Sequence, residues 1–135
     1  MRTMDLIDRH RIDVLDHIDQ QIDIPVLAGL QRQGDVIIIP NPELGAAVTP
    51  VPAAGTTVVR GESGGNTHTV VADGPAFCDP VTGRANQLRV AALTVPDGST
   101  AWLAHPEHGY MGIAPGTYEI RRQREQADEL RMVAD

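Results

Sequence analysis

Proline and glycine cut the middle of the chain into short β-branched runs, and this feature constrains the fold more than any other. Valine, isoleucine and threonine favour strands. Short strands that follow each other without helices between them are typical of sandwiches and barrels. The sequence therefore predicts a mainly β fold, a small antiparallel sandwich or barrel. The expected strands are 35–39, 56–60, 67–72, 87–95, 100–104 and 117–123.

Three connections between these runs have the residues of turns or loops. Gly61, Gly64 and Gly65 separate the runs 56–60 and 67–72, which predicts a hairpin. Pro96-Asp97-Gly98 predicts a turn, because proline presets the first turn dihedral and glycine accepts a positive φ. The stretch 41–55 holds three prolines, so we expect a loop or an edge crossing there.

Both ends of the chain are denser in charge than the middle, and we expect both to be helical. Residues 1–24 hold six aspartates and three arginines, and their apolar residues follow helical spacing. We expect Thr3 to cap this amphipathic helix and Pro25 to end it. The length of 135 residues fits one globular unit. Within it we expect a helical arm at 1–24, a β domain at 25–123 and a short helical tail at 124–135.

The net charge of −7 and the basic residues, all eleven of them arginine, exclude several functions. Without lysine there is no Schiff-base chemistry and no P-loop lysine. An acidic chain repels phosphate backbones and anionic membranes, so we expect neither nucleic acid nor membrane as a partner. Cys78 is the single cysteine and can form neither an internal disulfide nor a multi-thiolate zinc site. No apolar run is long enough for a signal core or a membrane span, so we expect a cytoplasmic protein.

Three histidines of the β region are candidate metal ligands. His105 and His108 lie in the piece His-Pro-Glu-His-Gly, where a tight turn can aim both imidazoles at one point. His68 follows the glycine-rich hairpin and has Glu62 upstream. With Glu62 or Glu107 as a fourth ligand or general base, these imidazoles could hold a divalent metal (zinc, iron or manganese) with an open position. The alternative is that they are loop histidines satisfied by backbone groups or water.

Other nucleophile patterns are weaker. Residues 61–65 match G-x-S-x-G with Ser63 at the centre, but strands on both sides replace the strand-to-helix turn that a nucleophile elbow needs. We expect Cys78 to be a buried, inert thiol, since His68 is the only base near it in the sequence. Trp102 is expected to pack in the core. We therefore assign no catalytic residue.

Each end of the chain has two interpretations. The basic cluster at 121–124 either pairs with the chain's own carboxylates, including those of the Asp-rich N-terminal segment, or docks an acidic partner. The N-terminal helix either packs on its own domain or docks on a partner protein. The residues that would carry the docking are Ile7, Leu15, Ile18, Ile22, Arg121, Arg122 and Arg124.

Five pieces of the chain resemble a group of small uncharacterised bacterial proteins. The group's pattern runs Q-G-D-V, G-E-x-x-G-H-x-H, H-P-E-H-G, P-P-G-x-Y and R-x-Q-R-E. The matching pieces, in the same order, are Gln33–Val36, Gly61–His68, His105–Gly109, Ala114–Tyr118 and Arg122–Glu125. The resemblance implies a shared β domain over residues 33–125 and no particular activity. Asn66 replaces the first imidazole of G-H-x-H, which argues against metal catalysis because asparagine is a poor transition-metal ligand.

Two hypotheses of function from different classes follow. The leading one is a non-enzymatic β domain that acts through protein–protein contacts, by self-association or as an accessory module of a bacterial or phage assembly. It depends on the lack of a complete catalytic constellation and on the charge concentrated at the ends. The alternative is a cupin-like divalent-metal-dependent enzyme or small-molecule binder that uses His68, His105 and His108, with cupins as an analogy only.

Overall fold

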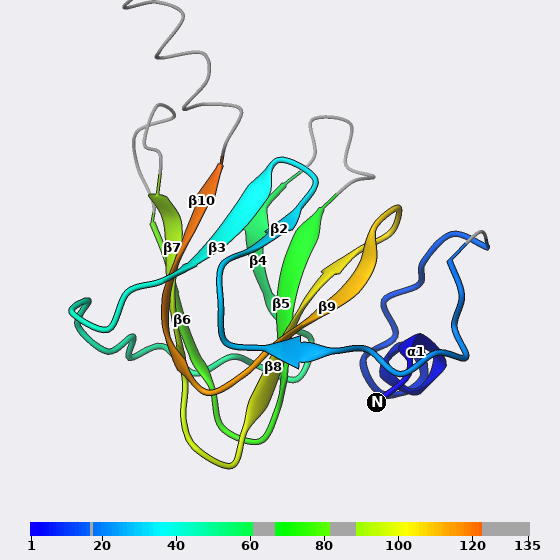
Figure 1. The fold of residues 1–135 in the computed structure, drawn as a ribbon, viewed down its shortest axis with the longest axis horizontal. Helices are drawn as coiled ribbons and strands as arrows, with labels where there is room; N and C mark the ends of the chain where they lie inside the picture. Colours follow the sequence, from blue (N-terminus) through cyan, green and yellow to red (C-terminus); the bar gives the residue numbers. More distant parts are fainter. Residues whose placement is uncertain (17, 61–66, 82–88, 123–135) are drawn as a thin grey trace, which may run out of the picture.

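Two five-stranded sheets pack face to face in the computed structural model, which describes residues 1–16, 18–60, 67–81 and 89–122 (Figure 1). Sheet 1 has the strand order β1-β9-β8-β5-β4 and sheet 2 the order β2-β3-β10-β7-β6. Neighbouring strands pair antiparallel, except that β1 runs parallel to β9. The elements are α1 Thr3–His10, β1 Val26–Leu27, β2 Gln31–Gln33, β3 Val36–Pro40, β4 Thr56–Val59, β5 His68–Asp73, β6 Phe77–Pro80, β7 Arg89–Val95, β8 Thr100–His105, β9 Gly109–Ile113 and β10 Gly116–Arg122.

The mainly β prediction is confirmed, and the described strands form a sandwich rather than a barrel. The predicted hairpin is β4 and β5, which pair antiparallel. The predicted Pro-Asp-Gly turn is present, with Gly98 at φ +85°. This turn leads from β7 in sheet 2 to β8 in sheet 1, so it joins the two layers rather than two paired strands.

The sequence pattern misses four strands, β1, β2, β6 and β9. The first two are only two and three residues long. Strand β6 contains Asp79 and Pro80, and β9 contains Gly109 and Gly112. These residue types are depleted in strands because they pack poorly or cannot donate to the ladder. Tertiary pairing with β7 and β8 overrides that local preference.

The space between the sheets holds an aliphatic core. Val70 and Leu103 enter it from sheet 1, and Ile38, Leu93 and Ile120 from sheet 2, each fully buried. The sheet 2 strands β3, β7 and β10 alternate buried and half-buried residues over most of their length, as expected when one face of a sheet meets the core. Full burial of one such side chain contributes about 1.5–3 kcal/mol, so this layer is the main source of stability.

A second apolar cluster lies on the outer face of sheet 1, where the N-terminal segment covers it. Leu6 and Val14 pack there against Val71, Trp102 and Tyr110. The arm therefore folds onto its own domain, and the prediction that Trp102 is a core residue is confirmed. In Figure 1 the helix lies beside sheet 1, on the side away from sheet 2.

The N-terminal helix is shorter than the sequence predicts. It ends at His10, where Arg11 adopts a left-handed conformation with φ +60°, and does not continue to Pro25. Aspartate is a weak helix former, and Asp16, Asp19 and Asp23 would repel each other at helical spacing. Thr3 is not the N-cap. Arg2 takes that position, and its backbone N–H donates to the Asp5 carboxylate at 3.0 Å.

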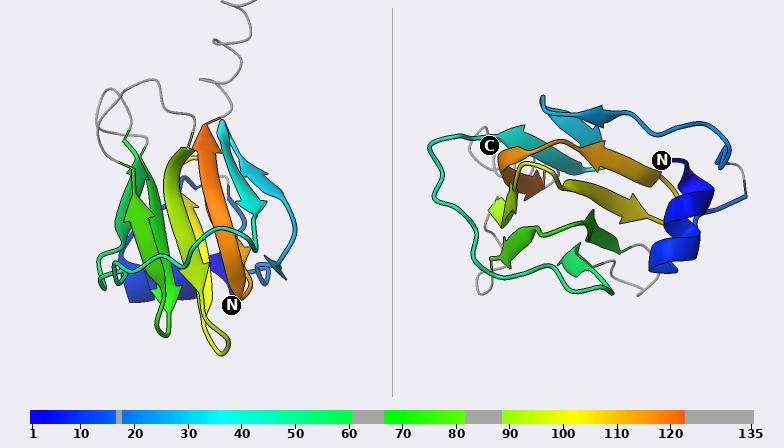
Figure 2. Two further views of the ribbon diagram at one scale, coloured as in Figure 1. Left: turned by 90° about the vertical axis from the view of Figure 1, so that its left-hand side faces the viewer. Right: turned by 90° about the horizontal axis from the view of Figure 1, so that it is seen from below.

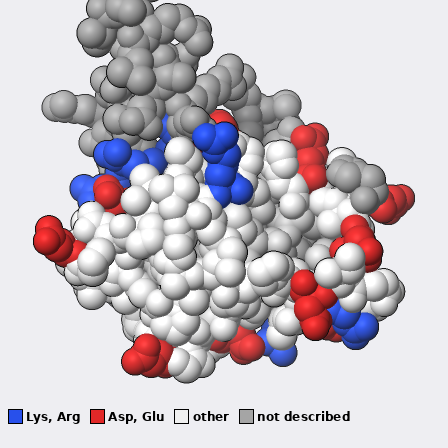
Figure 3. Space-filling view, in the orientation of Figure 1, with Lys and Arg blue, Asp and Glu red and all other residues white. Residues whose placement is uncertain are grey.

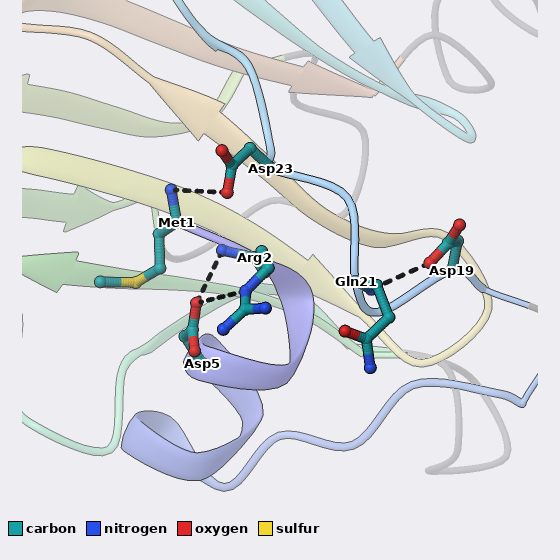
Figure 4. A network of polar contacts seen from close by, with 6 residues as sticks. All are labelled: Met1, Arg2, Asp5, Asp19, Gln21 and Asp23. Atoms are coloured by element: carbon teal, nitrogen blue, oxygen red, sulfur yellow. Dashed lines mark hydrogen bonds and ion pairs between the residues drawn. The ribbon is translucent and has the colours of Figure 1, made fainter.

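Polar contacts close the N-terminal segment on itself (Figure 4). Asp5 also accepts a hydrogen bond from Arg2 Nε at 3.4 Å, and these bonds lower the pKa of its carboxyl. Asp19 accepts a hydrogen bond from the Gln21 N–H at 2.9 Å, and the terminal amine lies 4.0 Å from Asp23. These exposed contacts shape the loop after the helix more than they stabilise it.

The stretch 41–55 crosses the lower part of the outer face of sheet 2, as the teal trace in Figure 2 shows. The backbone N–H of Ala47 donates to the Thr94 hydroxyl at 2.8 Å, and those of Val48 and Thr49 donate to the Asp79 carboxylate. The predicted loop is therefore confirmed, and it is fastened across strands β6 and β7. The predicted C-terminal helical tail lies outside the described residues, and no described helix has the length and hydropathy that a membrane span needs.

Candidate functional site

The three predicted histidines come together at the end of the sandwich where the β2–β3 and β8–β9 turns lie. His68 begins β5, His105 ends β8, and His108 lies in the turn that follows. The ring centroids are 4.3 Å apart for His68 and His105, 4.6 Å for His105 and His108, and 6.3 Å for His68 and His108. We call these residues the histidine cluster.

His105 shapes the turn that connects β8 to β9. Its Nδ1 accepts hydrogen bonds from the backbone N–H of Glu107 at 3.0 Å and of His108 at 3.3 Å. The ring thus satisfies two turn donors in the way an aspartate or asparagine side chain does at other turns. Because Nδ1 is the acceptor, the proton of the neutral ring is on Nε2.

The β2–β3 turn docks on this histidine turn through Gln33 and Gly34. The buried Gln33 amide donates from Nε2 to the carbonyls of Leu103 and Gly109, both at 3.1 Å. Gly34 has φ +61°, and a Cβ there would lie 2.9 Å from His108 Nε2. The glutamine and glycine of the Q-G-D-V piece therefore join sheet 2 to the H-P-E-H-G turn of sheet 1.

The N-terminal segment contacts the same turn from its other side. The Leu15 N–H donates to the Pro106 carbonyl at 2.7 Å, and Ile18 lies against Gly109, where a Cβ would come within 3.4 Å of it. The Tyr110 hydroxyl donates to the Ile12 carbonyl at 2.6 Å. The histidine turn is thus a joint that holds sheet 2 on one side and the N-terminal segment on the other.

His68 is the buried member of the cluster, with 4% of its surface exposed. Neither ring nitrogen makes a hydrogen bond of ordinary geometry with a described residue, although the Gln33 backbone is near enough to favour the protonated form. Burial, and then the positive charge that His105 can carry, lower the pKa of His68 to about 4, and Asp35 opposes this shift. His68 is therefore neutral at neutral pH.

The arrangement of the described side chains fits a transition metal poorly. A histidine that binds metal through Nε2 keeps its proton on Nδ1 and donates it to an acceptor. The Nδ1 of His105 instead accepts two backbone donors, which leaves the proton on Nε2. Across the described ranges, no three His, Cys, Asp or Glu side chains are arranged to hold an ion. Glu107 is exposed in the turn, and Glu62 lies outside the described residues.

The other nucleophile candidates contribute no chemistry to this site. Ser63 of the G-x-S-x-G match lies outside the described residues. Cys78 is fully buried in β6, and burial raises the pKa of its thiol to about 12, which confirms the expected inert cysteine.

The residues predicted to dock a partner differ in their exposure and in their contacts. Ile7 and Ile18 pack at the edge of the cluster on sheet 1 and are half-buried. Leu15 and Ile22 are 46% and 64% exposed. Arg121 lies 3.8 Å from Glu119, a carboxylate of its own strand. Arg122 is half-buried and has an interaction of its own, and Arg124 lies outside the described residues.

Sequence reasoning missed an exposed apolar strip that begins at Ile22. Ile22, Val26, Leu27 and Leu30 are 64%, 40%, 51% and 66% exposed, and we call them the apolar strip. The backbone there is held close to β9, since a Cβ at Gly112 would come 2.5 Å from the Pro25 carbonyl oxygen. One signal was available in the sequence, because residues 24–31 contain no charge.

Comparisons with known proteins identify a family without a known activity. No curated protein and no solved structure matches this chain. A family model described as "Domain of unknown function (DUF8820)" matches residues 32–123, which include the β2–β3 turn, the histidine cluster and the last strand. Because this match spans well over half of the sequence, the chain belongs to the DUF8820 family of uncharacterised domains.

Proposed function

We propose that this protein is a non-enzymatic β-sandwich module that acts by contact with protein, and that the apolar strip is its contact surface. The observation that carries the proposal is the exposure of four large apolar side chains within nine residues, 22 to 30. Single exposed apolar residues are ordinary, but four of them close together in the sequence expose more apolar surface than scattered single residues do.

The strip has the features that favour association in water. Full burial of each such side chain is worth about 1.5–3 kcal/mol. Val26 and Leu27 form β1, the edge strand of sheet 1, and an edge strand offers unpaired backbone groups to another chain. Figure 3 shows few charged atoms on the face where β1 and β2 lie, so little charge would have to be desolvated there.

The occupant that we propose is a second copy of this chain. Each copy carries a net charge of −7, so two copies repel each other unless they meet through surfaces that carry little charge or charges of opposite sign. Residues 24–31 are such a surface. Most oligomers of soluble proteins are also assemblies of identical chains.

Sedimentation velocity over a range of concentrations tests the proposal. We expect the wild type to associate, and the double variant Leu27→Asp, Leu30→Asp to sediment as a monomer. The control is Val48→Asp, Val81→Asp, which adds the same charge at two exposed apolar positions of sheet 2 and the loop over it. It should associate like the wild type. A wild type that stays monomeric at every concentration would refute the proposed function.

A further inference from the structure

Three arginines form a row across the outer face of sheet 2. Arg32 of β2 and Arg121 of β10 both pair with Ile37 of β3, and Arg121 also pairs with Arg89 of β7. Since neighbouring strands are about 4.8 Å apart, Arg32 and Arg121 are separated by about 10 Å at their Cα atoms. We call Arg32, Arg89 and Arg121 the arginine row.

The row points outward and is only partly neutralised. Both neighbours of Arg32 in β2, and Ile120 before Arg121 in β10, are more buried than these arginines. Glu119 lies 3.9 Å from Arg89 and 3.8 Å from Arg121. Arg32 is exposed and has no ion-pair partner among the described residues. Two arginines directly opposite each other on neighbouring strands destabilise a sheet. Among the described residues, one carboxylate pairs with two of the three guanidinium groups, which leaves the row positive.

The matching negative surface lies on the other side of the molecule. Asp13, Asp16, Asp19 and Asp23 are exposed in the loop that follows the N-terminal helix, and we call them the acidic loop. Leu15 and Ile22 stand exposed among them, and Ile22 is also the first residue of the apolar strip. The arginine row has Ile37 and Ile39 half-exposed beside it, so both surfaces combine charge with apolar side chains.

The two surfaces cannot meet within one copy. The acidic loop belongs to the segment that covers the outer face of sheet 1, and the row is on the outer face of sheet 2. Both sheets lie between them, and stacked sheets alone are about 10 Å apart. Figure 3 shows acidic side chains with a few arginines among them on the side of the N-terminal segment, and further arginines at the top and upper left. The interpretation that the basic cluster pairs with the chain's own carboxylates holds for Arg121, and its partner is Glu119 rather than an aspartate of the N-terminal segment.

We propose that the acidic loop of one copy docks on the arginine row of the next, so that the chain assembles head to tail. This inference rests on the proposed function, because it names the surface of the second copy that the N-terminal side of the first one meets. A contact between two different surfaces leaves one of each free at the ends. Such assemblies grow into rings or filaments.

A protein surface fits the row better than a nucleic acid does. Ile37 lies between Arg32 and Arg121, and Ile39 is two residues further along β3 on the same face. A phosphate backbone would leave both half-exposed isoleucines without an apolar partner. The acidic loop supplies Leu15 and Ile22 together with its carboxylates. The overall charge of −7 also repels a long polyanion, whereas four carboxylates on one loop match a short row of arginines.

Two neutralising variants of the full chain test this inference. Arg32→Gln, Arg121→Gln removes the row but keeps the acidic loop, and Asp13→Asn, Asp16→Asn removes half the acidic loop but keeps the row. Each pair lies on the surface, so both proteins should fold with the far-ultraviolet circular dichroism of the wild type. If Arg121→Gln disturbs its strand, Arg32→Gln alone is the substitute, because Arg32 is exposed and unpaired among the described residues. Matched controls are Arg60→Gln on sheet 1 and Asp97→Asn at the far end of the sandwich.

We expect each double variant alone to associate about tenfold more weakly than the wild type, in a salt-dependent way. An equimolar mixture of the two keeps one intact row and one intact acidic loop. It should therefore form a 1:1 dimer that grows no further, seen by sedimentation velocity and native mass spectrometry. Both controls should behave like the wild type.

The outcomes separate this inference from the proposed function. Association that needs Leu27 and Leu30 but ignores both neutralising variants would overturn the head-to-tail contact and leave the proposed function standing. A mixture in which no 1:1 dimer forms, while the wild type associates, would also overturn it. A monomeric wild type would overturn both.

Discussion

The two outer faces of the sandwich differ in what covers them. The outer face of sheet 1 carries Trp102 and Tyr110, and the first residues of the chain bury it. The upper part of the outer face of sheet 2 carries the arginine row, with apolar residues that are only half-buried. The N-terminal segment therefore covers the outer face of sheet 1, and the upper part of the outer face of sheet 2 stays exposed. The face that the chain itself covers contributes to stability, whereas we propose the charged, half-exposed face as a contact surface between copies.

The largest predicted effect tests the covered face. Leu6→Ala removes a fully buried side chain that anchors the helix on sheet 1, and should lower the free energy of unfolding by about 3 kcal/mol. Ile37→Ala on sheet 2 should cost about 1 kcal/mol, because its side chain is already half-exposed. Urea denaturation of both variants measures the difference. Equal losses would mean that the N-terminal segment is not an integral layer of the domain.

The sequence predicts the pieces of this fold better than their arrangement. The β4–β5 hairpin, the turn at Gly98 and the buried Cys78 all follow from local residue preferences. The passage of the chain from β7 in sheet 2 to β8 in sheet 1 could not be predicted. A short turn has the same residue types whether it joins two paired strands or two different sheets. The helical spacing of residues 7 to 22 was misleading. Val14 and Ile18 pack in the cluster on sheet 1 from an irregular loop, and Leu15 and Ile22 are exposed.

The candidate surfaces were predictable to different degrees. The grouping of His68 with the H-P-E-H-G turn follows from short motifs in a small β domain, and the three rings do lie together. The arginine row needs the strand register, because Arg32, Arg89 and Arg121 are far apart in sequence and meet only through β3 and β10. No local pattern contains that information.

The second predicted effect concerns the joint between the two faces. The folded-state pKa of His68 is about 4, below the ordinary 6.5, so as pH falls the unfolded chain binds this proton first. The stability that neutral His68 provides is complete above pH 6.5 and is lost between pH 6.5 and 4. The loss from this residue reaches about 3 kcal/mol at pH 4. The groups that face it are His105, His108, Asp35 and the Gln33 backbone.

Denaturant titrations at a series of pH values measure this loss. His68→Gln should flatten the dependence between pH 6.5 and 4, since glutamine does not titrate. His108→Gln is the matched control, because it replaces an exposed ring of the same cluster and keeps the buried His68. Asp5 and Asp79, whose carboxyl pKa values are lowered by hydrogen bonds, act only at lower pH and remain in both variants. An unchanged slope in His68→Gln would show that the buried ring does not control acid stability.

The smallest predicted effect on stability comes from a substitution beside the arginine row on sheet 2. It should lower the stability of the fold and strengthen association between copies. Glu119→Gln removes the negative charge beside Arg89 and Arg121. The glutamine carbonyl can still accept the hydrogen bond that the Asn41 amide donates at 3.2 Å. The pairs are half-exposed and longer than 3.7 Å, so we expect the free energy of unfolding to fall by less than about 1 kcal/mol, and by less still at high salt.

The same change makes the arginine row more positive, so an acidic loop from a second copy should bind it more tightly. Parallel measurements of urea denaturation and sedimentation velocity at low salt would reveal this divergence. Weaker association in Glu119→Gln would mean that the row serves the fold of sheet 2 rather than contact between copies.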